Sequence, residues 1–258
     1  MNIPAINGII RRRILLNYRI TPAVVSAILP SRFRPKLVGG YSIAGICLIR
    51  LEQIRPKGLP KFLGISSENS AHRIAVEWEV DDGETCEGVF VPRRDTDSRL
   101  NSLTGGRLFP GVHHFSKFLV NDSEDSISMH VTGDDVQVPL VDLEVRATTG
   151  FPESSVFASL SEASEFFEAG CVGYSSRPDS CILDGLLLQV SDWHVSPLVI
   201  SHARSSYFDD CSIFPQGSIE LDHALLMRDI PHEWHAQPEM VSDQATTSKV
   251  SILPHSPS

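Results

Sequence analysis

The stretch IAVEWEVDDGETCEGVFV, residues 74–91, decides the fold of this chain. Its first seven residues alternate between large apolar side chains and Ala or Glu, which places Glu77 and Glu79 on one face. A period of two indicates a β-strand with one face in a core. Asp-Gly at 82–83 is a hairpin signal, and the apolar residues 88–91 then predict a strand that pairs back antiparallel.

Short apolar runs of the same kind continue on both sides of this hairpin. Residues 41–51 are almost continuously apolar and predict a buried strand. One helix interrupts the later strands, because Ser159 and Glu162 match a capping box and Gly170 can end the helix. Many short strands with few helices predict a mainly β (minor α+β) antiparallel barrel or sandwich. The later strands are predicted at Phe115–Val120, Ser126–Val131, Val138–Arg146, Gly170–Tyr174, Leu183–Val190, Leu198–Ser201 and Ser218–Leu226.

Composition and charge limit the classes of protein to consider. The 258 residues predict one β domain over 1–236 and a disordered Ser/Thr/Pro-rich tail over 237–258. A net charge of -10 argues against nucleic-acid binding, and no apolar run approaches the roughly 20 residues that span a bilayer. The five scattered cysteines include no C-x-x-C pair, so we expect reduced thiols and a soluble, cytoplasmic protein.

The succession of these segments resembles the domain-of-unknown-function 2071 family, in the acetoacetate-decarboxylase-like superfamily. Four motifs carry the resemblance, which extends to about Trp234. The resemblance implies a cone of antiparallel strands around a pocket. The motifs are Arg-Pro-Lys-Gly-Leu-Pro at 55–60, Arg-Asp-Thr-Asp-Ser at 94–98, Gly-Gly-Arg-Leu-Phe-Pro-Gly at 105–111 and Leu-Met-Arg-Asp-Ile-Pro-His at 226–232.

The chain departs from the decarboxylases at the catalytic amine. In those enzymes a Gly-Arg pair precedes Pro-Lys-Lys, and one lysine forms a Schiff base with the substrate. Here the comparable pair is followed by His113 and His114, and Lys117 is displaced by an odd number of residues, which turns it to the opposite strand face. We therefore expect no Schiff-base decarboxylation.

The two histidines are the first candidates for catalysis. Imidazole titrates near neutral pH and can relay protons. Adjacent strand residues point to opposite faces, so only one of His113 and His114 can face a given pocket. The alternative is a histidine satisfied by a backbone carbonyl.

Two arginines are candidates for substrate binding. Arg107 follows two glycines and could offer a bidentate fork to a carboxylate; alternatively it holds the loop at 94–97 through Asp95 or Asp97. Arg94 lies in the densely charged segment 92–97, predicted to be a connection, where the charges could bind an acidic substrate or satisfy one another in solvent.

Glu77 is the third candidate for catalysis. It could act as a general acid or base if its strand face looks into a barrel, since burial raises the pKa of a carboxyl group. If that face looks into solvent, Glu77 is an ordinary surface residue.

Together these features predict a protein that binds a small organic acid or carbonyl compound inside a β cone, as a non-decarboxylating enzyme or as a carrier. The alternative is a non-catalytic ligand-binding or interaction module, with an apolar cavity or an exposed patch. We expect no cofactor and no metal. The sequence predicts neither nucleic acid nor membrane as partner and leaves a homo-oligomer open.

Overall fold

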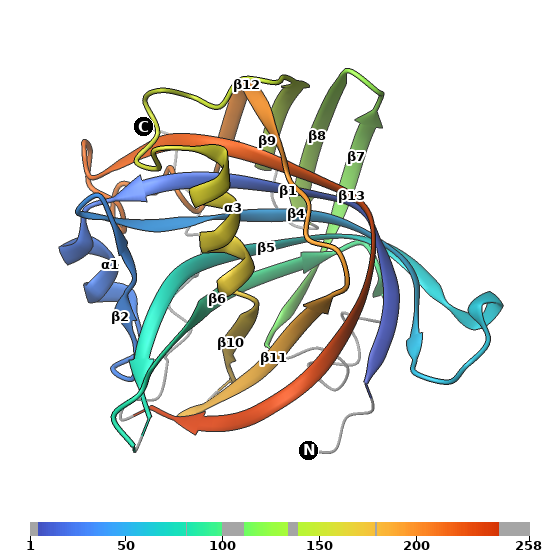
Figure 1. Cartoon of the computed structure of the whole chain (residues 1–258), viewed down its shortest axis with the longest axis horizontal. Helices are drawn as coiled ribbons and strands as arrows, with labels where there is room; N and C mark the ends of the chain where they lie inside the picture. Colours follow the sequence, from blue (N-terminus) through green and yellow to red (C-terminus); the bar gives the residue numbers. More distant parts are fainter. Residues whose placement is uncertain (1–4, 81, 100–110, 134–138, 179, 243–258) are drawn as a thin grey trace, which may run out of the picture.

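The computed structural model describes residues 5–80, 82–99, 111–133, 139–178 and 180–242. It is a strongly curved β structure with a helix, α3, seated in its concavity (Figure 1). No helix in these ranges is long and apolar enough to cross a membrane. The elements are β1 Ile6–Ile20, α1 Pro22–Ile28, β2 Arg34–Pro35, β3 Leu37–Val38, β4 Tyr41–Pro56, η1 Lys61–Leu63, β5 Ile65–Glu79, β6 Thr85–Thr96, β7 His113–Asp122, β8 Ser126–Gly133, β9 Pro139–Ala147, α3 Leu160–Ala169, β10 Val172–Ser176, β11 Ile182–Val190, β12 Ser196–Ser205 and β13 Ile219–Val241.

The strands form one sheet that closes on itself twice. The first circuit runs β6-β7-β8-β9-β12-β13-β1-β4-β5 and closes because β5 also pairs with β6. The second circuit runs β11-β10-β6-β5-β4-β1-β13 and closes because β11 pairs with β13. The strands β13, β1, β4, β5 and β6 thus form a wall common to both circuits.

Because this wall separates two interiors, its alternating side chains pack into two hydrophobic cores. The first core, inside the first circuit, contains Ile14 and Leu16 of β1. The second core contains Leu15, between them in sequence, together with Phe166 and Phe167 of α3. Both faces of the wall are buried, which explains the nearly continuous apolar runs in its strands.

The helix α3 begins and ends where the sequence predicts. The Ser159 hydroxyl accepts a hydrogen bond from the Glu162 backbone N–H at 3.2 Å, and the Gly170 N–H donates to the Phe166 carbonyl. Ala163, Phe166 and Phe167 lie on the buried face of the helix. The capping therefore fixes the two phenylalanines that cover the second core.

The sheet corrects three expectations. It is mixed rather than wholly antiparallel, since β6 pairs parallel with both β7 and β10. The charged residues 92–96 are not a connection: they continue β6, where Asp95 is buried. The strand β13 runs to Val241, so the predicted tail cannot begin at 237, and residues 243–258 lie outside the described ranges.

Candidate functional site

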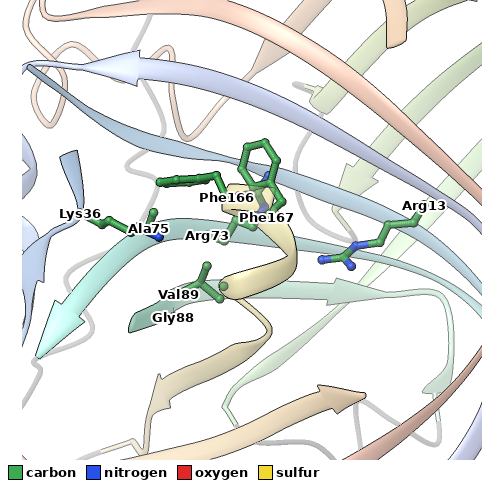
Figure 2. Close-up of a pocket in the computed structure, with 9 residues that line it drawn as sticks. Arg13, Lys36, Arg73, Ala75, Gly88, Val89, Phe166 and Phe167 are labelled. Carbon is green, nitrogen blue, oxygen red and sulfur yellow. The ribbon is translucent and has the colours of Figure 1, made fainter. Parts of the chain in front are cut away.

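A small cavity lies inside the second circuit, beneath α3. Its volume is about 30 Å³, enough for about one water molecule. Arg13 of β1 and Arg73 of β5 point toward it, and Phe166 and Phe167 of α3 cover it (Figure 2). Lys36 also lines the cavity, so three cationic side chains meet an aromatic cover.

The two arginines are held without a carboxylate partner. The Arg13 guanidinium donates to Cys47 Sγ at 3.6 Å and lies 5.7 Å from the centre of the Trp193 ring. The Arg73 guanidinium donates to Cys47 Sγ at 3.1 Å and packs 4.6 Å from the Phe167 ring centre. Within the described ranges, no Asp or Glu forms an ion pair with either residue. Buried charges are usually paired, so this interior is suited to an incoming anion.

Cys47 lies between these guanidinium groups on β4 and is 4% exposed. Burial alone would raise the pKa of its thiol. The charges of Arg13 and Arg73, with their N–H···S hydrogen bonds, outweigh burial, and the pKa is lowered. The Cys47 sulfur is thus a hydrogen-bond acceptor that the described residues offer to both arginines.

A series of buried, hydrogen-bonded side chains orients Arg73. Its guanidinium donates to Asn17 Oδ1, and the Asn17 amide donates to His223 Nε2 at 2.9 Å. His223 Nδ1 donates to Asp222 Oδ1 at 2.6 Å, which fixes the neutral tautomer that accepts from Asn17. Burial lowers the pKa of His223 against the opposing effect of Asp222, in agreement with a neutral ring. This series holds Arg73 in place without neutralising it.

Arg94 approaches the same interior from β6. Its guanidinium donates to Ser175 Oγ of β10 at 3.3 Å, while its Nε is buried with no hydrogen-bond partner. Burial lowers the pKa of Arg94 to about 10, and the Cys47 charge opposes that shift. We call the group Arg13, Cys47, Arg73 and Arg94 the arginine chamber. Among the described residues no carboxylate forms an ion pair with Arg94 either.

The two predicted histidines diverge, as strand alternation requires. His113 lies opposite Arg94 across the parallel β6–β7 pairing, and His114 lies opposite Asp95. Arg94 belongs to the chamber, whereas Asp95 accepts hydrogen bonds from Ser70 and Ser116 on the other face of the wall. Burial lowers the pKa of His114, with Arg93 acting in the same direction. His113 is therefore the histidine whose register position adjoins the chamber.

Glu77 is placed away from the chamber. Its carboxylate forms an ion pair with Arg34 at 3.2 Å, and Glu79 pairs with the same guanidinium at 2.7 Å. Both glutamates line a surface groove beside Phe33 and Trp78. The structure thus gives Glu77 the solvent-side surroundings that the sequence left as the alternative.

Sequence reasoning missed most of this chamber. Arg107 lies outside the described residues, as does the stretch 100–110 around it. Arg13, Cys47 and Arg73 were not candidates, although Arg13 and Arg73 directly precede the apolar runs 14–16 and 74–76 and Cys47 lies inside the apolar run 43–49. That pattern is the signal that could have found them, because a charge inside a two-sided buried strand needs a partner or a ligand.

Lys36 is a further residue that the sequence did not suggest. Its ammonium forms an ion pair with Glu87 and lies 4.3 Å from the centre of the Phe166 ring. Among the described lining residues Lys36 is the single lysine, and it is engaged by a carboxylate.

Comparison with known proteins gives a family and a fold. The DUF2071 family model, described as an uncharacterized conserved protein, matches residues 10–196. No curated protein sequence matches the chain. An acetoacetate decarboxylase from Legionella pneumophila is similar at TM-score 0.58 with 14% identity, over 92% of this chain and 88% of that one.

Two further solved structures share this architecture. An acetoacetate decarboxylase-like enzyme from Sphingomonas wittichii has TM-score 0.59 with 12% identity, over 94% of this chain and 95% of that one. The enduracididine biosynthesis enzyme MppR, solved with pyruvate, has TM-score 0.55 with 11% identity, over 93% and 91% of the two chains. Identities this low establish a common fold and nothing finer.

Proposed function

Because the chain belongs to the DUF2071 family and has the acetoacetate-decarboxylase fold, we propose that it binds a small organic acid with a carbonyl group in the arginine chamber. The observation that carries the proposal is the pair Arg13 and Arg73, which line one cavity and form no ion pair with any described carboxylate. Guanidinium groups bind carboxylates through parallel hydrogen bonds, so an anionic ligand would supply the missing partner.

The size and cover of the cavity favour a compact ligand. At about 30 Å³ the cavity holds little more than a water molecule, so a ligand larger than water must displace part of its lining. Pyruvate, the ligand of MppR, is a 2-oxo acid of suitable size and charge. The cationic side chains that line the cavity favour an anion site. A carrier of neutral compounds would be expected to have an apolar cavity instead.

The first experiment measures thermal shifts of the full chain with pyruvate, acetoacetate, acetate and acetone. A ligand that binds only the folded state raises the melting temperature. At a free ligand concentration of one hundred times Kd, it adds about 2.7 kcal/mol to the free energy of unfolding. We expect shifts with the two oxo acids, a smaller one with acetate and none with acetone. A flat response of the wild type to both oxo acids would overturn the proposal.

Matched variants locate the site. Arg73→Gln and Arg13→Gln should each abolish the pyruvate shift, whereas Arg204→Gln should keep it, because Arg204 is an exposed arginine paired with Asp209. Two separate chamber variants guard against misfolding of one of them. Shifts in both that equal the wild-type shift would remove the chamber from the binding site.

A trapping experiment separates this mode of binding from Schiff-base chemistry. Borohydride reduces an imine between a lysine and an oxo acid to a stable amine, which intact mass spectrometry detects. We expect no pyruvate adduct, because the Lys36 ammonium is paired with Glu87. An adduct mapped to Lys36 would replace the proposal with a lysine-dependent mechanism.

A further inference from the structure

Cys47 is the residue of the chamber that the proposed function leaves without a role. Its Sγ accepts hydrogen bonds from Arg73 Nε at 3.1 Å and from Arg13 Nη2 at 3.6 Å. The two donors come from strands on opposite sides of β4, since β1 and β5 are its two neighbours in the sheet. A neutral thiol is a weak acceptor, and two converging guanidinium donors are the surroundings of a thiolate.

The same two arginines connect the sulfur to the cavity. Both arginines line the cavity, whereas Cys47 does not, and Arg73 is fixed by its bond to Asn17. A carboxylate bound by the two guanidinium groups would therefore share their N–H donors with the sulfur. The described charged and titratable groups that act electrostatically with Cys47 are Arg13, Arg73 and Arg94, all cationic, and the thiol Cys171. No carboxylate is among them, so the described groups around the sulfur stabilise its anion.

We propose that Cys47 is a thiolate nucleophile that adds reversibly to the carbonyl carbon of the acid bound in the arginine chamber. The sulfur lone pair forms the S–C bond, and the π pair of the C=O bond moves to the carbonyl oxygen. No other bond breaks, and no oxidant or leaving group is needed. The negative charge passes from sulfur to oxygen and stays among the same guanidinium groups, which stabilise it there. This step rests on the proposed binding function.

Ionisation of the thiol is tested by ultraviolet thiolate absorbance of the native chain. At neutral pH the wild type should show an absorbance that Cys47→Ser lacks and Cys171→Ser retains. Addition of pyruvate should remove it in the wild type, because the adduct is a thioether-like sulfur. Equal absorbance of the wild type and Cys47→Ser at neutral pH would overturn the proposal.

Reactivity is tested by alkylation with iodoacetate and iodoacetamide, read by peptide mass mapping. The exposed Cys211 serves as an internal control in the same digest. A cationic chamber should make Cys47 react faster with the anionic reagent, whereas Cys211 should prefer the neutral one. Pyruvate should protect Cys47 alone. A Cys47 that reacts with neither reagent while Cys211 is fully modified contradicts the proposal, as does the same reagent preference at both residues.

Variants separate this proposal from the binding function. Arg73→Gln should raise the pKa of the Cys47 thiol and so slow its reaction with iodoacetate. The rate should fall about tenfold for each unit by which that pKa exceeds neutral pH. Arg73→Lys, which keeps the positive charge, should restore part of the rate. Arg204→Gln, outside the chamber, should keep both the thermal shift with pyruvate and the reactivity of Cys47. An unreactive Cys47 in a wild-type protein that binds pyruvate refutes only the nucleophile, whereas the absence of any shift in the wild type refutes the binding site itself.

Discussion

The three consecutive arginines of β1 lie in three different surroundings. Arg11 is half exposed and pairs with Glu52 and Asp229 on the surface. Arg12 is buried and forms ion pairs with Glu68 at 2.6 Å and Asp122 at 3.0 Å. Arg13 enters the chamber. Arg12 and Arg13 point to opposite faces of the strand, and Arg11 lies at the register shift between Ile10 and Arg12 in the pairing with β4.

Removal of the buried arginine should be costly. Arg12→Met leaves the Glu68 carboxylate buried without its main partner, and breaking such a pair costs about 3–5 kcal/mol. Arg11→Met is the matched control, since an exposed ion pair contributes about 0–1 kcal/mol. Urea unfolding of both variants measures the difference. A loss below about 1 kcal/mol for Arg12→Met would show that the pair does not stabilise the fold.

His72 gives the protein a dependence of stability on pH. Its ring is 2% exposed and packs against Tyr207 and Phe208, with Ser205 as its hydrogen-bond partner. Burial lowers its pKa to about 4, from an ordinary value of 6.5; Asp95 opposes the shift and Arg93 reinforces it. Below about pH 6.5 the unfolded chain binds the proton that the folded chain refuses, so stability falls as pH drops towards 4.

The variant His72→Gln removes this titration and keeps a polar group for Ser205. The wild type should lose about 3 kcal/mol from this residue between pH 6.5 and 4, and the variant should have a flatter profile. Urea unfolding at several pH values measures both profiles. Burial also lowers the pKa of His232 to about 4, so the stability of the variant still falls as the pH drops, but less steeply than that of the wild type. Parallel profiles of wild type and variant would contradict the assignment.

At the scale of elements, local sequence signals located most strands and the long helix. Predicted strands such as 183–190 and 126–131 match β11 and β8 closely, because period-two patterning and turn residues act locally. The prediction was wrong at 92–96, where β6 continues through charged residues. Asp95 is tolerated there because Arg93 of the same strand, Ser70 of β5 and Ser116 of β7 donate to it, and the two serines from other strands leave no mark in the local pattern.

The cap of α3 offers a prediction at this scale. Ser159→Ala removes the acceptor of the Glu162 N–H and should cost about 1 kcal/mol of unfolding free energy. Ser161→Ala, in the same helix, removes only an exposed hydrogen bond to Glu165 and should cost less than about 0.5 kcal/mol. Chemical denaturation compares the two. Equal losses would mean that the cap does not hold the helix over the cavity.

At the scale of the whole molecule, the double closure of the sheet could not be predicted from the sequence. The resemblance implied a single cone around a pocket, whereas β13 pairs with β12, β1 and β11 along its length. Only residues 218–226 of this long strand were predicted, because its later half contains Asp229 at positive φ and Pro231. The chamber residues were missed because the sequence does not show which face of the neighbouring strands β1, β4 and β5 lines a cavity.

Hydrogen exchange should reveal the common wall. Strand β1 is paired with β13 on one side and β4 on the other, and Ile14, Leu15 and Leu16 have no exposed surface. We expect their amides to exchange only on global unfolding, and those of the two-residue strands β2 and β3 to exchange through local opening. Mass-spectrometric or nuclear magnetic resonance exchange rates check this order. Fast exchange at 14–16 would contradict it.

The common wall also divides the chain by parity. Over residues 13–17 of β1, 43–48 of β4, 71–76 of β5 and 223–227 of β13, even-numbered side chains belong to the first core and odd-numbered ones to the second core or the arginine chamber. A mutational library restricted to odd positions would therefore vary the second core and the arginine chamber and leave the side chains of the first core unchanged. Natural variation can use the same division. Substitutions at the odd positions can change specificity within one backbone, while the even positions preserve the ability to fold.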